Sequence, residues 1–322
     1  MDQDNKPIVI VSKCLGFEHC RWNGEIVNDE FVEGLAAHVV FHPVCPEKEI
    51  GLGVPRDPIR IVSSRGVASL VQPATGRDVT SEMLDFCEGF MASTGTVDGF
   101  LLKSRSPSCG PGDVKIYPAG GKSGAMDKGP GFFGGAVLAA FPDLAIESDG
   151  RLKNFRIREH YLTRLFTISR FRAIQKSAAM RDLVDFHARN KLLLMAYNQS
   201  ELKVLGKIVA NHEHRQVEEL IPLYRDHLAR ALLRSPRYTS NINVLMHALG
   251  YFSREITPRE KGYFLEALER YRAGNIPLSA VSSIVNSWIV RFNQAYLQQQ
   301  SFFQPYPEEL AFISDSGKGR DL

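Results

Sequence analysis

The sequence predicts an α/β domain followed by an all-α helical bundle, and two observations carry that prediction. In the first half, short apolar runs alternate with helical segments and are separated by Gly and Pro. This alternation predicts a mainly parallel, Rossmann-like sheet with covering helices. From Arg158 onward the chain shows long helical periodicity without strand alternation. Since 322 residues suit two domains, we place them at residues 1–150 and 151–322.

In the first half, four segments read as strands and two as helices. The strands are short, apolar and rich in β-branched residues; they are Pro7 to Ser12, His38 to His42, Val97 to Lys103 and Val114 to Tyr117. The helices are expected at Ser81 to Ser93 and Gly134 to Phe141. The segment Pro118 to Pro130 is too rich in Gly for regular structure and reads as a mobile loop or lid. Its G-G-K-S-G run does not complete a phosphate-binding loop pattern.

The second half reads as several helices of roughly 15 to 25 residues. Apolar residues recur at helical spacing, as in Leu183, Phe186 and Leu194. Prolines divide the pattern, and each is expected near a helix start; they are Pro222, Pro236, Pro258 and Pro277. A polar tail follows from about Ser314.

Composition excludes several classes of protein. With 44% apolar and 23% charged residues, the chain has the composition of a soluble globular protein. It starts acidic and polar, and no run of roughly 18 apolar residues follows, so we expect a cytoplasmic protein without membrane contact. All five cysteines lie in the first 109 residues. An odd, one-sided set in a reducing compartment argues against disulfides and leaves metal binding, catalysis or core burial.

The two halves carry opposite charge. Residues 1–150 hold 13 Lys and Arg against 20 Asp and Glu, whereas residues 151–322 hold 26 against 16. A basic half joined to an acidic half suggests a polyanionic partner such as nucleic acid. The alternative is a helical domain whose excess Lys and Arg lie on a solvated face.

Three cysteines stand at equivalent places in the predicted sheet. Cys14, Cys45 and Cys109 each follow a predicted strand, so the carboxyl ends of the strands bring them to one edge of the sheet. Their turns are rich in Gly, Pro or Ser, where backbone N–H groups can face a cluster sulfur or stabilise a reactive thiolate. Cys87 lies within an apparent helix and fits the core. Cys20 stays open as a fourth ligand, a neighbouring thiol or a structural residue.

Polar residues accompany these cysteines. Glu47 lies two residues after Cys45, where burial beside a thiolate suits general acid/base chemistry, and Glu49 is the alternative carboxylate. Serines alternate ahead of Cys109, and one of them can hydrogen-bond a substrate carbonyl or a bound sulfur; they are Ser104, Ser106 and Ser108. The alternative for these serines is turn capping.

Three motifs resemble the signature of the TudS-like thiouracil desulfidase family over roughly residues 6 to 150. They are S-K-C-L-G-F-E-H-C-R-W-N-G (Ser12 to Gly24), P-V-C-P-E-K-E-I-G-L-G-V-P-R (Pro43 to Arg56) and L-K-S-R-S-P-S-C-G (Leu102 to Gly110). In single-domain members the first motif reads closer to S-x-C-L-L-G, whereas here one Leu is absent and Cys20 is present.

The helical half resembles the YbgA-like domain from Arg158 to Leu310. The resemblance is clearest in F-H-A-R-N-K-L-L-L-M-A-Y-N-Q (Phe186 to Gln199), L-G-K-I-V-A-N (Leu205 to Asn211), N-V-L-M-H-A-L-G-Y-F (Asn243 to Phe252) and P-Y-P-E-E-L (Pro305 to Leu310). This order of domains is similar to that of fused RudS-type enzymes, which act on 4-thiouridine in tRNA.

The resemblance implies a site and a reaction. It implies a 4Fe-4S cluster held by Cys14, Cys45 and Cys109, with Glu47 and Ser104 as catalytic residues. The implied activity is a tRNA 4-thiouridine desulfidase that forms uridine by non-redox transfer of sulfur to the open iron of the cluster. The alternatives are a desulfidase of free thiouracil or related small thiolated bases, and a non-enzymatic iron-sulfur redox or sensor protein. No protein partner is identifiable.

A tRNA substrate would account for the positive charge of the second half, because Lys and Arg contacts to phosphates supply most of the affinity of a protein for nucleic acid. The basic candidates are Arg164, Arg170, Arg172, Lys176, Arg189, Lys191, Lys203 and Lys207. Three polar residues, which can contact RNA or fix a helix junction, are Tyr197, Asn198 and Gln199.

Overall fold

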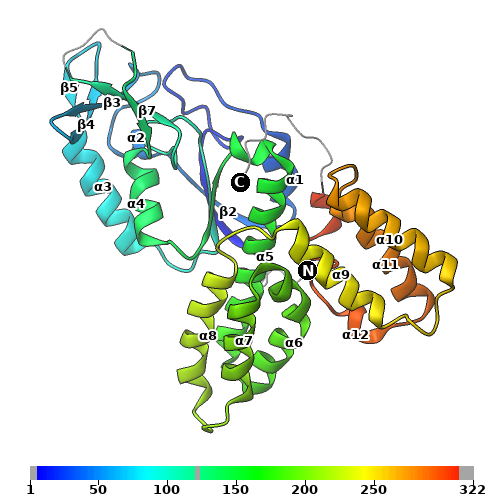
Figure 1. Cartoon of the computed structure of the whole chain (residues 1–322). Coiled ribbons are helices and arrows are strands. Elements are labelled where there is room, and N and C mark those ends of the chain that lie inside the picture. Colours follow the sequence, from blue (N-terminus) through cyan, green and yellow to red (C-terminus); the bar gives the residue numbers. More distant parts are fainter. Residues whose placement is uncertain (1–5, 120–123, 312–322) are drawn as a thin grey trace. The chain divides into compact units, whose positions relative to one another are not determined.

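The computed structural model describes residues 6–119 and 124–311, which form two compact units. The first unit extends to Ser169 and takes up the chain again from Pro307, and the second runs from Arg170 to Tyr306. The division between the units falls inside one long helix, α5 (Phe155–Ser177). Figure 1 shows strands with covering helices in the first unit and helices alone in the second.

Four parallel strands form the first sheet of the α/β unit, in the order β2 (Val40–Val44), β1 (Ile8–Ser12), β6 (Gly99–Leu102) and β9 (Ala145–Ser148). The register pairs Ser12 with Val44, so β1 and β2 end side by side. The strands β1 and β6 are almost entirely buried, as expected for parallel strands covered on both faces. The predicted fold class, a mainly parallel α/β domain before a helical bundle, is confirmed.

A second sheet was not expected from the sequence. Its order is β5 (Arg77–Asp78), β4 (Val67–Gln72), β3 (Arg60–Ser64), β7 (Val114–Pro118) and β8 (Asp127–Gly129). The strand β3 pairs antiparallel with β4 and parallel with β7. Because β8 lies within Pro118 to Pro130, the prediction of no regular structure there is wrong at its C-terminal end. Residues 120–123 of that segment, like the tail from Ser314, lie outside the described residues.

Helices cover these sheets and close the core of the first unit. They are α1 (Glu30–Ala36), α2 (Pro46–Glu49), α3 (Thr80–Ser93) and α4 (Phe132–Ala140), followed by β9 and the short helix η2 (Arg151–Lys153). Met83, Phe100 and Phe133 are fully buried in one hydrophobic cluster. The start of α5 also belongs here, since a Cβ added at Gly99 on β6 would lie 2.9 Å from Leu165. The returning chain forms η3 (Glu308–Leu310), which buries Leu310 and contacts α1.

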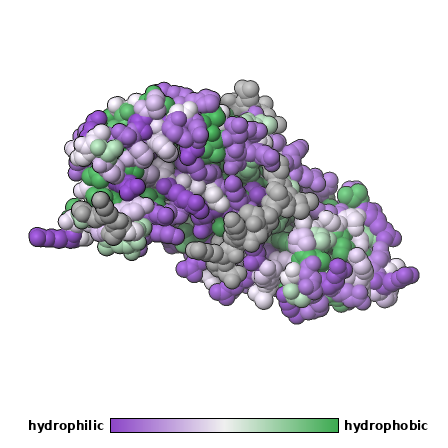
Figure 2. Space-filling model, turned by 90° about the horizontal axis from the view of Figure 1, so that it is seen from above, coloured by the Kyte–Doolittle hydropathy of each residue, from purple (hydrophilic) through white to green (hydrophobic). Residues whose placement is uncertain are grey.

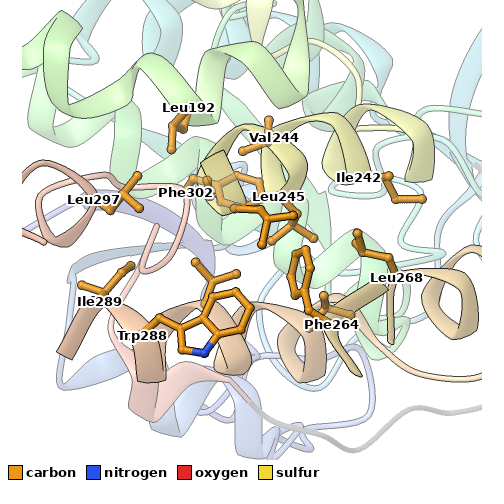
Figure 3. Packing of buried hydrophobic residues seen from close by; sticks show 14 of the residues in the cluster. Leu192, Ile242, Val244, Leu245, Phe264, Leu268, Trp288, Ile289, Leu297 and Phe302 are labelled. Carbon is orange, nitrogen blue, oxygen red and sulfur yellow. The ribbon is translucent and has the colours of Figure 1, made fainter. Parts of the chain in front are cut away.

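The second unit is helical throughout its described length. Its helices after α5 are α6 (Met180–Tyr197), α7 (Gln199–Ala210), α8 (Val217–Ala231), α9 (Tyr238–Gly250), α10 (Pro258–Arg272), α11 (Leu278–Arg291) and α12 (Ala295–Gln298). Side chains from five of them meet in one core, where Figure 3 shows Leu245, Phe264 and Trp288 facing one another. Pro258 and Pro277 begin helices as predicted, but Pro222 lies inside α8, so its placement near a helix start is wrong.

In the part of the chain that the structure describes, no helix is both long enough and apolar enough to span a membrane. Hydrophilic side chains cover most of the face seen in Figure 2, and hydrophobic groups occur in scattered patches.

Candidate active site

A cavity of about 1650 Å³ lies in the first unit beyond the carboxyl ends of β1, β2 and β6. Four of the five cysteines line it, namely Cys14, Cys20, Cys45 and Cys109. The convergence follows from topology, because three adjacent parallel strands end at the same edge of the sheet. The sequence-predicted residues Glu47 and Ser104 line the same cavity.

The turn that carries Cys14 is held by backbone hydrogen bonds. The Leu15 amide donates to the Ser12 carbonyl over 2.9 Å, and the Val27 amide donates to the Cys14 carbonyl over 2.8 Å. Gly16 has φ +89°, a left-handed conformation that glycine adopts without strain. These contacts fix the direction in which the chain leaves β1 and so the place of Cys14.

Cys45 lies where β2 passes into α2. The amides of Lys48 and Glu49 both donate to its carbonyl over 3.0 Å, which makes Cys45 the N-cap of this short helix. Glu18 pairs with Lys13 over 2.6 Å and also with Lys48, so one carboxylate ties the Cys14 turn to α2. The hydrogen bond from Lys13, reinforced by Lys48, lowers the pKa of Glu18 to about 2.

The Cys109 turn is seated on the start of α4 by close backbone contact. The Gly134 amide donates to the Ser108 carbonyl over 2.9 Å, and the Gly131 amide donates to the Gly110 carbonyl over 2.7 Å. A Cβ at Gly134 would lie 2.4 Å from the Gly110 carbonyl oxygen and 2.6 Å from that of Cys109. Glycine is therefore required sterically at this position of α4.

Cys20 lies close to two of the other cavity thiols. Cys20 is within hydrogen-bonding reach of the thiols of both Cys14 and Cys45, and the bond with Cys14 is the main cause that raises the pKa of Cys20 to about 11. The contact with Cys20, together with burial, raises the pKa of Cys45. Burial raises the pKa of Cys109 to about 12. Cys87 lies on α3 and belongs to the hydrophobic core of the first unit, where burial alone raises its pKa to about 11.

Glu47 is held from two sides. Its Oε2 accepts hydrogen bonds from Arg56 Nε at 2.8 Å and Nη2 at 2.6 Å, while its Oε1 accepts one from Ser108 Oγ at 2.7 Å. The Arg56 side chain is only 4% exposed. Ser108 also contacts Ser106, whose Oγ accepts from the Cys109 amide at 3.1 Å. The carboxylate is thus oriented toward the Cys109 turn as a fixed hydrogen-bond acceptor.

Ser104 belongs to a second polar group at the cavity. Lys103 Nζ donates to Ser104 Oγ at 3.0 Å and to Asp149 Oδ2 at 2.6 Å. Asp149 Oδ1 accepts from the Ser104 amide at 2.6 Å, so the carboxylate at the end of β9 holds both residues. The three serines singled out in the sequence therefore divide, since Ser104 joins Lys103 whereas Ser106 and Ser108 join Glu47.

Sequence reasoning left Arg56, Lys103 and Asp149 without a role. Arg56 and Lys103 stood within the quoted motifs, and the available signal was a cation in the same motif as a candidate catalytic residue, Glu47 for Arg56 and Ser104 for Lys103. Asp149 gave no local signal, because its contact with Lys103 joins residues 46 positions apart.

In the helical unit, the candidates for RNA contact fall into two groups. Lys176, Lys191, Lys203, Lys207 and Gln199 are exposed. Arg189 is exposed as well, but its Nε donates to Asp185 at 2.6 Å.

The other candidates serve the fold. Arg172 is 8% exposed, and Arg170 donates to the Pro305 carbonyl in an environment whose burial lowers its pKa to about 10, so both expectations of RNA contact are wrong. Asn198 Oδ1 caps α7 by accepting from the amides of Ser200 and Glu201. Tyr197 packs against two helical cores.

Arg164 lies in the first unit, where its side chain is partly buried and Nη2 donates to the Asp143 carbonyl at 3.4 Å. It therefore does not belong to the exposed basic surface of the helical unit.

The donor set at the cavity fits an iron-sulfur cluster by its chemistry, since thiolates are the ligands that such clusters take. Among the described residues, no three His, Cys, Asp or Glu side chains converge at the spacing of a single metal ion. A cluster binds each thiolate through a different iron and so suits cysteines spread around a cavity. Cys14, Cys45 and Cys109 come from three separate strand ends and are spread in this way.

Comparisons with known proteins match both halves of the chain. Residues 9–149 match the family model described as 2-thiouracil desulfurase. The uncharacterised protein YbbK of Bacillus subtilis (strain 168) is 31% identical over 114 residues, which are 33% of this chain and 76% of YbbK. The chain belongs to the 2-thiouracil desulfurase family. This confirms the family that the three cysteine motifs predicted.

The helical half of this desulfurase-family chain has relatives of its own. Residues 191–307 match the model of a protein family of unknown function, DUF1722. The uncharacterised protein YbgA of Escherichia coli (strain K12) is 28% identical over 154 residues, which are 47% of this chain and 91% of YbgA. The predicted fusion of a TudS-like with a YbgA-like domain is thereby confirmed.

One solved structure is also similar, a protein described as the 4Fe-4S-dependent thiouracil desulfidase TudS. It is 28% identical, covers 46% of this chain and 93% of its own, and superposes with a TM-score of 0.36.

Proposed function

We propose that this protein is a desulfidase of thiolated pyrimidines that uses a 4Fe-4S cluster and acts on 4-thiouridine in tRNA. The observation that carries the proposal is the convergence of Cys14, Cys45 and Cys109 with Glu47 on one cavity, in a chain of the 2-thiouracil desulfurase family. The three thiolates would hold the cluster. When bound, such a cluster supplies a Lewis-acidic iron without a protein ligand, which favours soft sulfur.

The chain's own residues then have separable tasks. Glu47 is placed to take a proton from the water that replaces the sulfur, because its carboxylate lines the cavity and already accepts a hydrogen bond from Ser108 of the Cys109 turn. Arg56 and Ser108 keep that carboxylate oriented. The net change exchanges C=S for C=O, with water consumed and hydrogen sulfide released. No electron enters or leaves, so the reaction is hydrolytic.

The charge of the helical unit supports RNA over a free base. Residues 170–306 hold 19 Lys and Arg against 11 Asp and Glu. A free base offers no phosphate to such a surface, whereas tRNA offers one at every nucleotide. The exposed lysines Lys191, Lys203 and Lys207 of α6 and α7 are the proposed phosphate contacts.

The deciding experiment is mass spectrometry of nucleosides from thiolated tRNA after anaerobic incubation with the reconstituted full chain. The full chain is needed because α5 and the segment after Pro307 both contribute to the first unit. We expect 4-thiouridine to become uridine with release of sulfide, and Glu47→Gln to slow this conversion by about 100-fold or more. Unchanged 4-thiouridine in the presence of a full cluster would contradict the proposal. Conversion of free thiouracil alone would favour the small-base alternative.

The RNA surface has its own test. Replacing Lys191, Lys203 and Lys207 together by Gln should weaken tRNA binding and lower the slope of log affinity against log salt by roughly 2 to 3. The matched control replaces Arg215, Arg225 and Arg272 by Gln, since each is paired with a neighbouring acid and none is a candidate for RNA contact. Because both variants lose three positive charges, equal losses would show that net charge, and not this surface, binds tRNA.

A further inference from the structure

Lys103, Ser104 and Asp149 form a hydrogen-bonded group whose contacts go beyond those that cap a turn. Asp149 is 7% exposed and uses both carboxylate oxygens, one on the Lys103 ammonium and one on the Ser104 amide. A buried charge pair is stable only when its geometry and hydrogen bonds are good. The pair therefore fixes an ammonium at the wall of the cavity, where Lys103 keeps 21% of its side chain exposed.

Two hydrogen-bond donors remain available at this wall. An ammonium has three N–H donors, and within the described chain Lys103 Nζ uses two of them. Ser104 Oγ accepts from Lys103 and, among the described residues, its hydroxyl donates to no other group. Both residues line the cavity that holds the four thiols.

The two donor atoms are 3.0 Å apart, so both can reach a single oxygen. A carbonyl oxygen has two lone pairs and accepts two such bonds. Gly150 leaves room beside Ser104, since a Cβ there would lie 2.9 Å from Ser104 Oγ. Lys103 and Ser104 therefore suit a carbonyl acceptor, whereas the side of the cavity that carries the cysteines suits the sulfur of a substrate.

We propose that Lys103 and Ser104, fixed by Asp149, bind the ring carbonyl oxygen that a thiolated pyrimidine keeps on the other side of the ring nitrogen N3 from its thiocarbonyl group. The inference rests on the proposed desulfidase function and names what that site recognises. In 4-thiouracil the recognised atom is the oxygen on C2. Lys103 is the main specificity-determining residue, because a charged donor makes the stronger hydrogen bond.

The test compares two free substrates under anaerobic conditions, 4-thiouracil and pyrimidine-4-thione, which lacks the C2 oxygen. The reconstituted wild-type chain should prefer 4-thiouracil in kcat/KM by roughly 10- to 100-fold, because a site built to hydrogen-bond a group rejects the analogue without it. Lys103→Met should remove most of that preference, because kcat/KM should fall further for 4-thiouracil than for pyrimidine-4-thione. Lys103→Arg should restore part of the preference.

Lys115→Met is the matched control, since Lys115 is exposed on β7 and does not line the cavity. It should leave the preference unchanged. Removing Lys103 alone leaves Asp149 without its cation, so Lys103→Met combined with Asp149→Asn keeps this part of the cavity neutral if the single variant does not fold. Ser104→Ala should lower the preference by a smaller factor.

The outcomes separate this inference from the proposed function. If the variants lower kcat/KM equally for both substrates, the carbonyl subsite is wrong while the desulfidase stands. If the wild type converts thiolated tRNA but neither free base, the same preference is measured with uracil and pyrimidin-4-one as competitive inhibitors. If the wild type desulfurises none of these substrates, the proposed function itself fails.

Discussion

Cys20 and Cys87 have thiols whose pKa is raised to about 11 in the same unit, yet for different reasons. Cys20 owes its shift first to the thiol of Cys14, whereas Cys87 owes it to burial among apolar side chains. Both are buried, at 1% and 4% exposure. The difference shows that a cysteine's neighbours, and not its burial, separate the chemistry of the cavity from that of the core.

The largest expected effect is the difference in cluster content between a variant that lacks a cavity thiol and one that lacks the core thiol of Cys87. Cys45→Ala should abolish iron and sulfide binding after anaerobic reconstitution, because a cluster depends on each thiolate ligand. Cys87→Ala should keep full iron content and lower the unfolding free energy by only about 1 kcal/mol. Iron and acid-labile sulfide per chain are the measurements. Full cluster content in each of Cys14→Ala, Cys45→Ala and Cys109→Ala would overturn the ligand assignment.

A smaller loss of iron content is expected from a substitution at Gly134, which supports the Cys109 turn. Gly134→Ala places a Cβ against the carbonyl oxygens of Cys109 and Gly110, so it should cost about 1 to 3 kcal/mol of unfolding free energy and lower iron content. Gly135→Ala is the control one residue on, where a Cβ meets only Pro130 at 3.5 Å. Thermal unfolding and iron analysis of both variants test this, and equal behaviour would mean that the turn adjusts freely.

The smallest effect concerns oxidation of the metal-free protein by dioxygen. Cys20 should form a disulfide with Cys14 or Cys45 in a fraction of chains, while Cys87 stays reduced because it is buried in α3 and burial is the one cause that raises the pKa of its thiol. The reaction should be faster at pH 9 than at pH 7, since the raised pKa of Cys20 keeps its thiol protonated at neutral pH. Peptide mapping by mass spectrometry locates the bonds. A disulfide at Cys87 would contradict the assignment of that residue to the core.

Many elements of both units were predicted from local patterns in the sequence. The strand ending at Ser12, the helix around Cys87 and the helical second half carry periodic apolar residues, and periodicity survives folding because it matches the geometry of each element. The second sheet escaped prediction because β5 and β8 are two and three residues long and mostly exposed, so they carry no apolar signal. The place of Pro222 inside α8 was missed for a similar reason, since a single residue cannot outweigh the packing of Leu220, Ile221 and Tyr224.

The sequence by itself determined the two-part architecture, the family and the arrival of Cys14, Cys45 and Cys109 at one sheet edge, because the parallel direction of the strands follows from local alternation of strands and helices. Only the tertiary structure decided which polar groups meet there. Lys103 and Asp149 are 46 residues apart, and Glu47 and Ser108 are 61 apart. Such pairs depend on side-chain direction at distant strand ends, which no local pattern records. The same holds for Cys20, whose role depends on the two thiols that folding brings beside it.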